Sequence, residues 1–112
     1  MKTALRPDET LLKQGAANLQ RGIETVGGHL YLTGQRLIFE AHALNVQSGA
    51  SELSLADIQS TAPVWTKLFN VIPLAPNSLA VRLNDGQEQR FVLFGRSAWA
   101  DAIDTARKHR AS

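Results

Sequence analysis

Two segments alternate apolar and polar residues on either side of a turn signal, and this pattern restricts the fold more than any other. Residues 28–40 carry strand-like runs around Gly34, and residues 78–94 carry similar runs around Gly86. A period of two is typical of strands with one buried face, and glycine in a short connection is typical of hairpins. The sequence therefore predicts an antiparallel sheet made of hairpins rather than parallel strands alternating with helices.

The turn lengths predict the register of both hairpins. A two-residue turn in the first hairpin places Leu32 opposite Leu37, and Leu30 opposite Phe39, on one face. These four side chains are apolar, so we expect that face in the core.

In the second hairpin, a two-residue loop would place Val81 opposite Arg90 and spoil the apolar face. A three-residue loop over 84–86, with its glycine left-handed, instead places Leu79 opposite Phe91. We therefore expect the three-residue loop.

Further strands are predicted before and between the hairpins. Residues 10–12 and 16–19 indicate a less regular first strand. Residues 52–58 alternate apolar with polar side chains and indicate another strand, followed by a further run over 58–65.

The pattern changes to a helical one near the C-terminus. Residues 97–108 carry apolar side chains at i, i+3, i+4 and i+7, which predicts an amphipathic helix with Ser97 as its N-cap. The apolar stripe consists of Trp99, Ala102, Ile103 and Ala106. Basic residues at 107–110 complement the negative end of the helix dipole.

These elements predict a mainly β fold, a bent antiparallel barrel or sandwich of about seven strands capped by one C-terminal helix. With 112 residues, we expect a single domain over 1–112 with a core over about 9–110. The chain has no cysteine, which excludes disulfides and thiolate chemistry. We expect a cytoplasmic protein, with peripheral attachment to the membrane as the alternative.

Several of these segments together resemble the GRAM domain family. That resemblance implies the pleckstrin-homology-like fold and, in general, a binding role, because members include both lipid-binding and protein-interaction modules. The matched positions are core and turn residues, none of which is a catalytic or ligand signature. They are residues 28–39, His42, 45–49, 53–58 and 85–86, followed by Phe91.

An enzymatic alternative rests on one cross-strand pair. The predicted register places His29 opposite Glu40, which could form an acid–base pair or half of a metal site. On a solvent-facing side of the sheet, such a pair is more often a weak surface contact. No phosphate-binding loop, nucleophile elbow or His-x-x-x-His spacing is present. We therefore expect no catalytic residues, no metal site and no cofactor.

The charge distribution favours neither nucleic acid nor lipid. The formal net charge is only +2, which is too small to indicate a nucleic-acid partner. In the predicted loop over 20–27, Arg21 lies near Glu24, so the clustered bases of a phosphate-binding loop are missing.

The apolar segment over 64–76 supplies the candidate binding residues. Its prolines at 73 and 76 argue against a regular strand, so we expect a loop. The loop either plugs an open end of the barrel or presents an exposed tip to a partner. The candidate contact residues are Trp65, Lys67, Leu68 and Phe69. We expect a protein partner or a homo-oligomer, with membrane lipid as the alternative.

Overall fold

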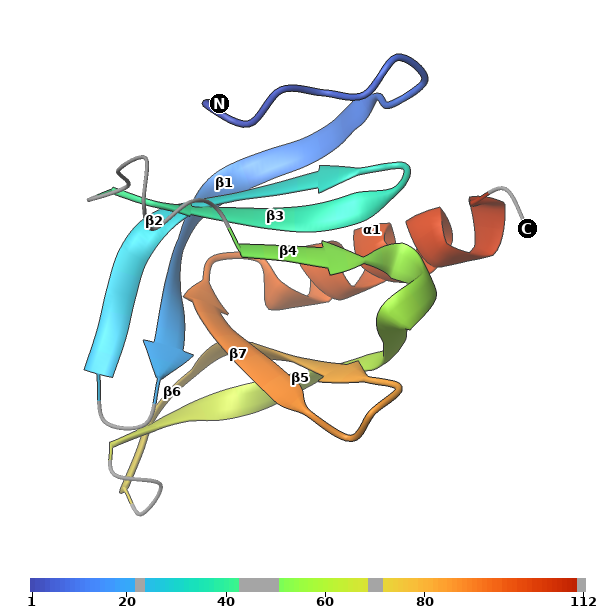
Figure 1. The fold of residues 1–112 in the computed structure, drawn as a ribbon. Coiled ribbons are helices and arrows are strands. Elements are labelled where there is room, and N and C mark those ends of the chain that lie inside the picture. The colour runs from blue at the N-terminus through green and yellow to red at the C-terminus, as the bar shows by residue number, and fades with distance from the viewer. Residues whose placement is uncertain (22–23, 43–50, 69–71, 111–112) are drawn as a thin grey trace.

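In the computed structural model, the described part of the chain forms a seven-stranded antiparallel sheet and one α-helix (Figure 1). The structure describes residues 1–21, 24–42, 51–68 and 72–110, with side chains throughout except at 21, 24, 65–68 and 72–77. The elements are β1 Leu11–Arg21, β2 Glu24–Thr33, β3 Arg36–Ala41, β4 Ser51–Ser54, a 3₁₀ turn η1 Leu55–Asp57, β5 Ile58–Leu68, β6 Ile72–Leu83, β7 Glu88–Leu93 and α1 Arg96–His109.

The sheet bends so that its two halves face each other. Its strand order is β4-β3-β2-β1-β7-β6-β5, so β1 belongs to both halves. In Figure 1, β2 to β4 form the upper layer, β5 to β7 form the lower layer, and α1 runs behind them. β4 and β5 are the two ends of this order, and η1 connects them. The predicted bent β architecture with one terminal helix is confirmed.

Both hairpin registers are also confirmed. The first hairpin pairs Leu32 with Leu37 and Leu30 with Phe39, and all four side chains are buried. The second hairpin pairs Leu79 with Phe91. Its three-residue loop is closed by a hydrogen bond from the Leu83 N–H to the Gln87 carbonyl (2.8 Å), and Gly86 has a φ of 90°.

The core lies between the two layers and under α1. The rings of Phe39 and Phe91, which come from opposite layers, have centroids 5.9 Å apart. The helix contributes Trp99, Ala100, Ile103 and Ala106, so the predicted stripe is largely correct. Full burial of a larger apolar side chain stabilises a fold by about 1.5–3 kcal/mol.

The outer face of the first hairpin was expected to face solvent, but it is largely buried. Tyr31, Ile38 and Glu40 are all buried on that face. Residues 1–9 lie across the upper layer, as Figure 1 shows, and they supply the cover.

Three local expectations were wrong. The segment 52–58 is not one strand, because β4 ends at Ser54, whose Oγ accepts the Ala56 N–H (3.3 Å) and starts η1. The predicted loop over 20–27 is shorter, since β1 runs to Arg21 and β2 begins at Glu24. The helix N-cap is Gly95, with a φ of 70°, rather than Ser97.

The proline-containing segment also differs from the prediction. β5 and β6 pair as one long hairpin in which Lys67 is opposite Pro73 and Leu68 is opposite Ile72. The ladder accommodates the prolines with register shifts between Val64 and Lys67. The β5–β6 hairpin therefore extends through most of the segment that we expected to be a loop.

Two arginines of α1 bind the backbone of β5. Arg96 Nη1 donates to the carbonyl of Val64 (2.8 Å), and Arg107 Nη2 donates to the carbonyl of Gln59 (2.6 Å). Asp104 Oδ1 accepts from the Thr61 hydroxyl (3.3 Å) and from Arg107 (3.3 Å). Arg107, at the basic end of the helix, thus has a structural role.

None of the helices in the described ranges is long and apolar enough to span a bilayer.

Candidate interaction surface

The cross-strand pair of the enzymatic alternative is held by the N-terminal segment. His29 is opposite Glu40, as predicted, but the Glu40 carboxylate accepts the N–H groups of Lys2 (3.0 Å) and Thr3 (2.7 Å). Burial works to raise the pKa of Glu40, yet these N–H groups hold it below its ordinary value. The His29 ring instead contacts Tyr31, with centroids 4.8 Å apart. Glu40 thus anchors residues 2–3 to β3.

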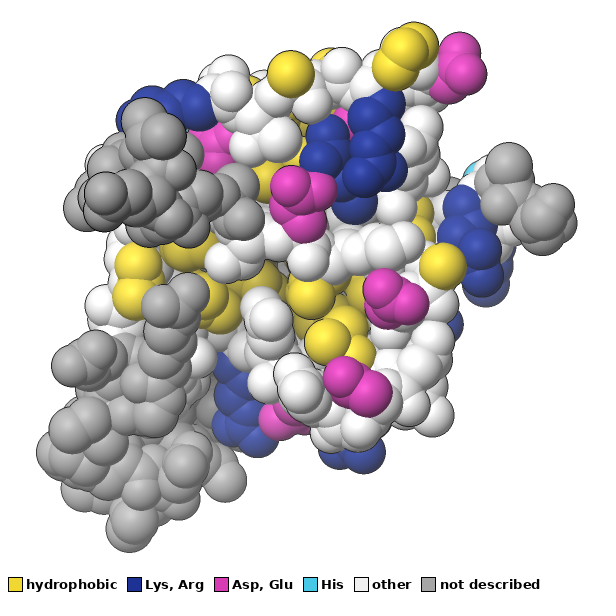
Figure 2. All heavy atoms as spheres, in the orientation of Figure 1, with side chains coloured by type: hydrophobic (Ala, Val, Ile, Leu, Met, Phe, Trp, Pro, Cys, Tyr) yellow, Lys and Arg dark blue, Asp and Glu magenta, His cyan; other side chains and the backbone are white. Residues whose placement is uncertain are grey.

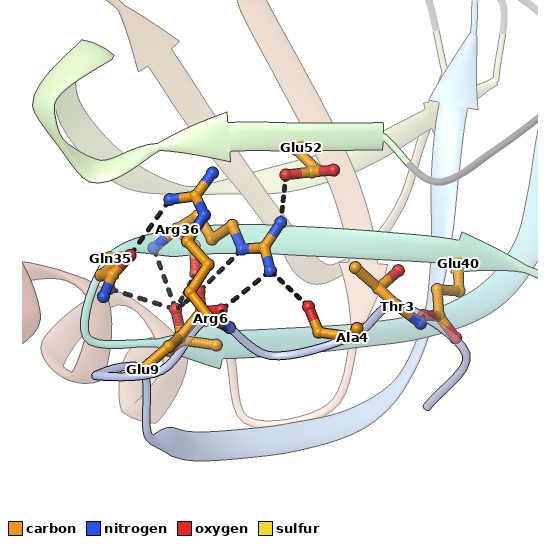
Figure 3. Close-up of polar contacts among 9 residues, drawn as sticks. Thr3, Ala4, Arg6, Glu9, Gln35, Arg36, Glu40 and Glu52 are labelled. Carbon is orange, nitrogen blue, oxygen red and sulfur yellow. Dashed lines mark hydrogen bonds and ion pairs between the residues drawn. The ribbon is translucent and has the colours of Figure 1, made fainter.

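A second polar cluster fastens the same segment to the turn end of the hairpin (Figure 3). Glu9 Oε2 and Oε1 accept from Nε (2.7 Å) and Nη2 (2.8 Å) of Arg36, and Thr33 Oγ1 donates to Glu9 Oε2 (2.7 Å). Arg36 also donates to Glu52 and to the Ala4 carbonyl.

The geometry of this cluster shifts the titration of both main partners. The Arg36 hydrogen bonds lower the pKa of Glu9 to about 2 against the opposing effect of burial, and Glu9 raises the pKa of Arg36. These buried donors and acceptors are engaged within the fold. The cluster is therefore a structural clamp rather than a ligand site.

The residues that the sequence pointed to lie at the far end of the β5–β6 hairpin. Trp65, Lys67 and Leu68 belong to β5, whose backbone is described, whereas their side chains lie outside the described part. Phe69 lies outside the described residues altogether. The structure brings the three strand residues onto one hairpin arm, and the choice between a plug and an exposed tip stays a prediction.

An apolar groove that the sequence reasoning missed lies between α1 and the sheet. The helix packs mainly on β5, β6 and η1, which leaves its other flank facing β1 and β2. The groove has a volume of about 450 Å³, and Leu12 on its wall is 53% exposed. It is lined by Leu12, Leu32, Asp101, Ala102, Thr105, Ala106 and His109. The sequence signal was the apolar Leu12 directly after Leu11, because adjacent strand residues point to opposite faces.

Another apolar side chain stands out on the surface. Phe94, directly after β7, is 92% exposed, and it borders a hollow of about 180 Å³ that Asn18 and His42 also line. Singly exposed apolar side chains are normal on protein surfaces, so this ring alone does not indicate a contact.

On the face drawn in Figure 2, Lys and Arg side chains lie in several separate places rather than in one patch. A hollow of about 300 Å³ beside β4 and the β6–β7 loop is lined by residues that include Glu52, Asp57 and Asp85. Each base near an anionic surface contributes only about 1 kcal/mol, so binding needs several together.

No family model matches this sequence, and no curated protein does. Solved structures do match the fold. The C-terminal domain of an unknown protein from Leishmania infantum has a TM-score of 0.73 at 15% identity, over 89% of this chain and 85% of that one. The Vps36 N-terminal PH domain has a TM-score of 0.68 at 18% identity, over 95% and 87%. The DH/PH domains of p115-RhoGEF have a TM-score of 0.70 at 15% identity, over 94% of this chain and 31% of that chain. At these identities the likeness shows the fold alone, which is pleckstrin-homology-like.

Proposed function

We propose that this chain is a non-catalytic binding module of the GRAM type that acts through protein–protein contact or self-association. The GRAM assignment rests on the sequence resemblance, and the pleckstrin-homology-like fold is compatible with it. The observation that carries the proposal is the apolar groove beside α1, whose exposed Leu12 and small helix residues are suited to contact with another protein surface.

The described polar groups support a role without catalysis. Glu40 accepts the backbone N–H groups of Lys2 and Thr3, which lower its pKa and make it a weaker base. A general base needs access to a substrate proton, and the fully buried Glu9 side chain, paired with Arg36, lacks that access. The described residues contain no group of three or more potential metal ligands.

Peripheral lipid binding is the alternative, and it rests on Lys67 beside Leu68 at the far end of the β5–β6 hairpin. One base beside an apolar tip is a weak membrane anchor, because stable attachment takes two signals. The dispersed bases on the face in Figure 2 therefore favour a protein partner over lipid. We propose a cytoplasmic location, because a chain without cysteine suits a reducing compartment.

Liposome flotation tests the proposal. Vesicles of phosphatidylcholine with phosphatidylserine, with and without a phosphoinositide, are mixed with the protein at low and physiological salt. We expect the protein to stay at the bottom of the gradient under every condition. Flotation that is lost on raising the salt, and lost in a Lys67→Glu variant, would overturn the proposal in favour of lipid binding.

A further inference from the structure

Residues 1–6 form a strap on the outer face of β2 and β3 and belong to no helix or strand (Figure 1). The Glu40 carboxylate accepts the N–H groups of Lys2 (3.0 Å) and Thr3 (2.7 Å), so the strap is held by its backbone. Figure 3 also shows the Ala4 carbonyl accepting from a guanidinium of β3 (2.9 Å). Main-chain hydrogen bonds supply affinity in several kinds of peptide recognition. The strap is therefore bound in the way that a separate peptide would be.

The side chains of the strap add little to its attachment. Met1 is 46% exposed, Leu5 is 41% exposed, and three of the other four residues are exposed as well. Arg6 Nη1 donates to Gln35 Oε1 (3.1 Å), but this contact is also exposed. None of the six strap residues belongs to the hydrophobic core of the described residues. The strap can therefore leave its place without opening the core between the two layers.

The face that receives the strap is held by contacts of its own. Glu9 pairs with Arg36 Nε (2.7 Å), and Glu40 is fixed in the ladder between β2 and β3. On this face, Tyr31 is 7% exposed and Ile38 is 0% exposed. Without a strap these apolar side chains would meet water, so an empty face favours the binding of another strap.

The hinge of the strap is a short exposed turn. The Glu9 N–H donates to the Arg6 carbonyl (3.0 Å), and Pro7 and Asp8 between them are exposed. When this turn opens, Glu9 stays on its own Arg36, and the link from Arg6 to Glu9 can span about 10 Å. Exchange of an identical element between two copies is an accessible route to a dimer, because it reuses contacts that already exist.

We propose that two copies of this chain exchange their straps, so that the strap of each copy binds the β2–β3 face of the other. This inference rests on the proposed function, in which the partner is a protein, and it names that partner. The contacts of the strap are re-formed twice about a two-fold axis, and only the turn over 7–8 changes. The short hinge keeps each strap close to its own face, so exchange grows with protein concentration.

The first test opens the hinge. Asp8→Pro places two prolines in succession, which favours an extended backbone, and proline is unsuited to the third position of the common turns. Sedimentation velocity over about 1–300 μM should show a dissociation constant at least about tenfold lower for this variant than for the wild type. Asp8 is exposed, so circular dichroism should confirm an unchanged fold. Asp8→Ala, which removes the same side chain but permits the turn, is the control and should behave like the wild type.

The second test separates the strap from its face. Thr3→Pro removes a backbone donor of the strap and leaves the face intact, whereas Glu40→Gln keeps the strap and removes the charge that binds it. In a mixture, the intact strap of one variant meets the intact face of the other. We expect a heterodimer that dissociates at least about tenfold less readily than either variant does alone.

Leu5→Pro replaces Thr3→Pro in the control mixture. The Leu5 N–H makes no hydrogen bond to the described part of the chain, so this proline should leave the strap on its own face. We expect no heterodimer with Glu40→Gln, because no intact face is empty.

Two outcomes overturn the inference. One is an Asp8→Pro variant that remains monomeric over the whole concentration range. The other is a mixture of Thr3→Pro with Glu40→Gln that associates no more strongly than its components do. Neither outcome touches the proposed function, because the α1 groove does not contain the strap and liposome flotation judges that proposal separately.

Discussion

At the residue scale, the buried pair of Glu9 and Arg36 is a sensitive point of the fold. The Glu9 side chain is fully buried, and Arg36 is 6% exposed, so removal of one partner leaves a charge without compensation. We predict that Glu9→Gln lowers the free energy of unfolding by about 3–5 kcal/mol, measured by urea denaturation.

The control for this change is Glu52→Gln, on the other side of the same guanidinium. The Glu52 side chain is 41% exposed, so water screens its pairing with Arg36. We expect a loss of about 0–1 kcal/mol. Equal losses at the two positions would contradict the assignment of Glu9 as the main partner.

The Glu9 carboxyl also makes the stability of the fold depend on pH. The pKa of Glu9 falls from 4.5 to about 2 on folding, so its contribution is complete above pH 4.5 and is lost as pH falls through 2. Glu40, whose pKa is also lowered, acts in the same direction. We predict that the free energy of unfolding of the wild type declines between these pH values more steeply than that of Glu9→Gln. Parallel pH profiles would exclude this role.

At the element scale, the pairing of β2 with β3 depends on a close backbone approach at Gly28. A Cβ atom there would lie 2.3 Å from the Glu40 carbonyl oxygen and 2.9 Å from the Ala41 Cα. Backbone atoms cannot move aside cheaply, so we predict that Gly28→Ala lowers the free energy of unfolding by about 3 kcal/mol or more. Thermal unfolding measures the loss.

Gly34, in the turn of the same hairpin, is the matched control. A Cβ atom there meets nothing within 4 Å, and the residue does not have a positive φ. Gly34→Ala should change stability by less than about 1 kcal/mol. A comparable loss at both positions would show that glycine content, rather than the close approach, matters in this hairpin.

The elements that the sequence predicted well are those whose geometry is local. Turn length and alternation determine the register, so the pairings of Leu30 with Phe39 and of Leu79 with Phe91 could be read in advance. The burial of the outer face of the first hairpin could not be predicted in this way. Residues 1–9 have no hydrophobic period, and they are held by distant contacts such as Glu9 with Arg36.

The prediction for the proline segment failed for a related reason. Proline removes one backbone donor, but strands tolerate it at bulges and edges, and β6 pairs with β7 only from Ser78 onward, so its prolines at 73 and 76 lie outside that ladder. Local sequence patterns could not predict the groove either. It exists because α1 packs against β5 and β6, and tertiary packing determines that position.

At the scale of the whole molecule, association should couple to thermal stability. A native dimer with unfolded monomers gains stability as protein concentration rises above the dissociation constant. We predict that the melting temperature of the wild type increases by roughly 2–4 °C for a tenfold rise in concentration in that range. Differential scanning calorimetry measures it, and a melting temperature that does not change with concentration would contradict self-association.

The two arginines that bind the β5 backbone affect how large an assembly of this protein can become. β5 ends the sheet, and an exposed strand at such a place invites pairing with the strand of another molecule. The guanidinium groups of Arg96 and Arg107 occupy the carbonyls of Val64 and Gln59, and the helix that carries them stands along this rim. Growth by strand addition into fibres is thereby discouraged at β5, and loss of α1 would convert a finite particle into one prone to open-ended polymerisation.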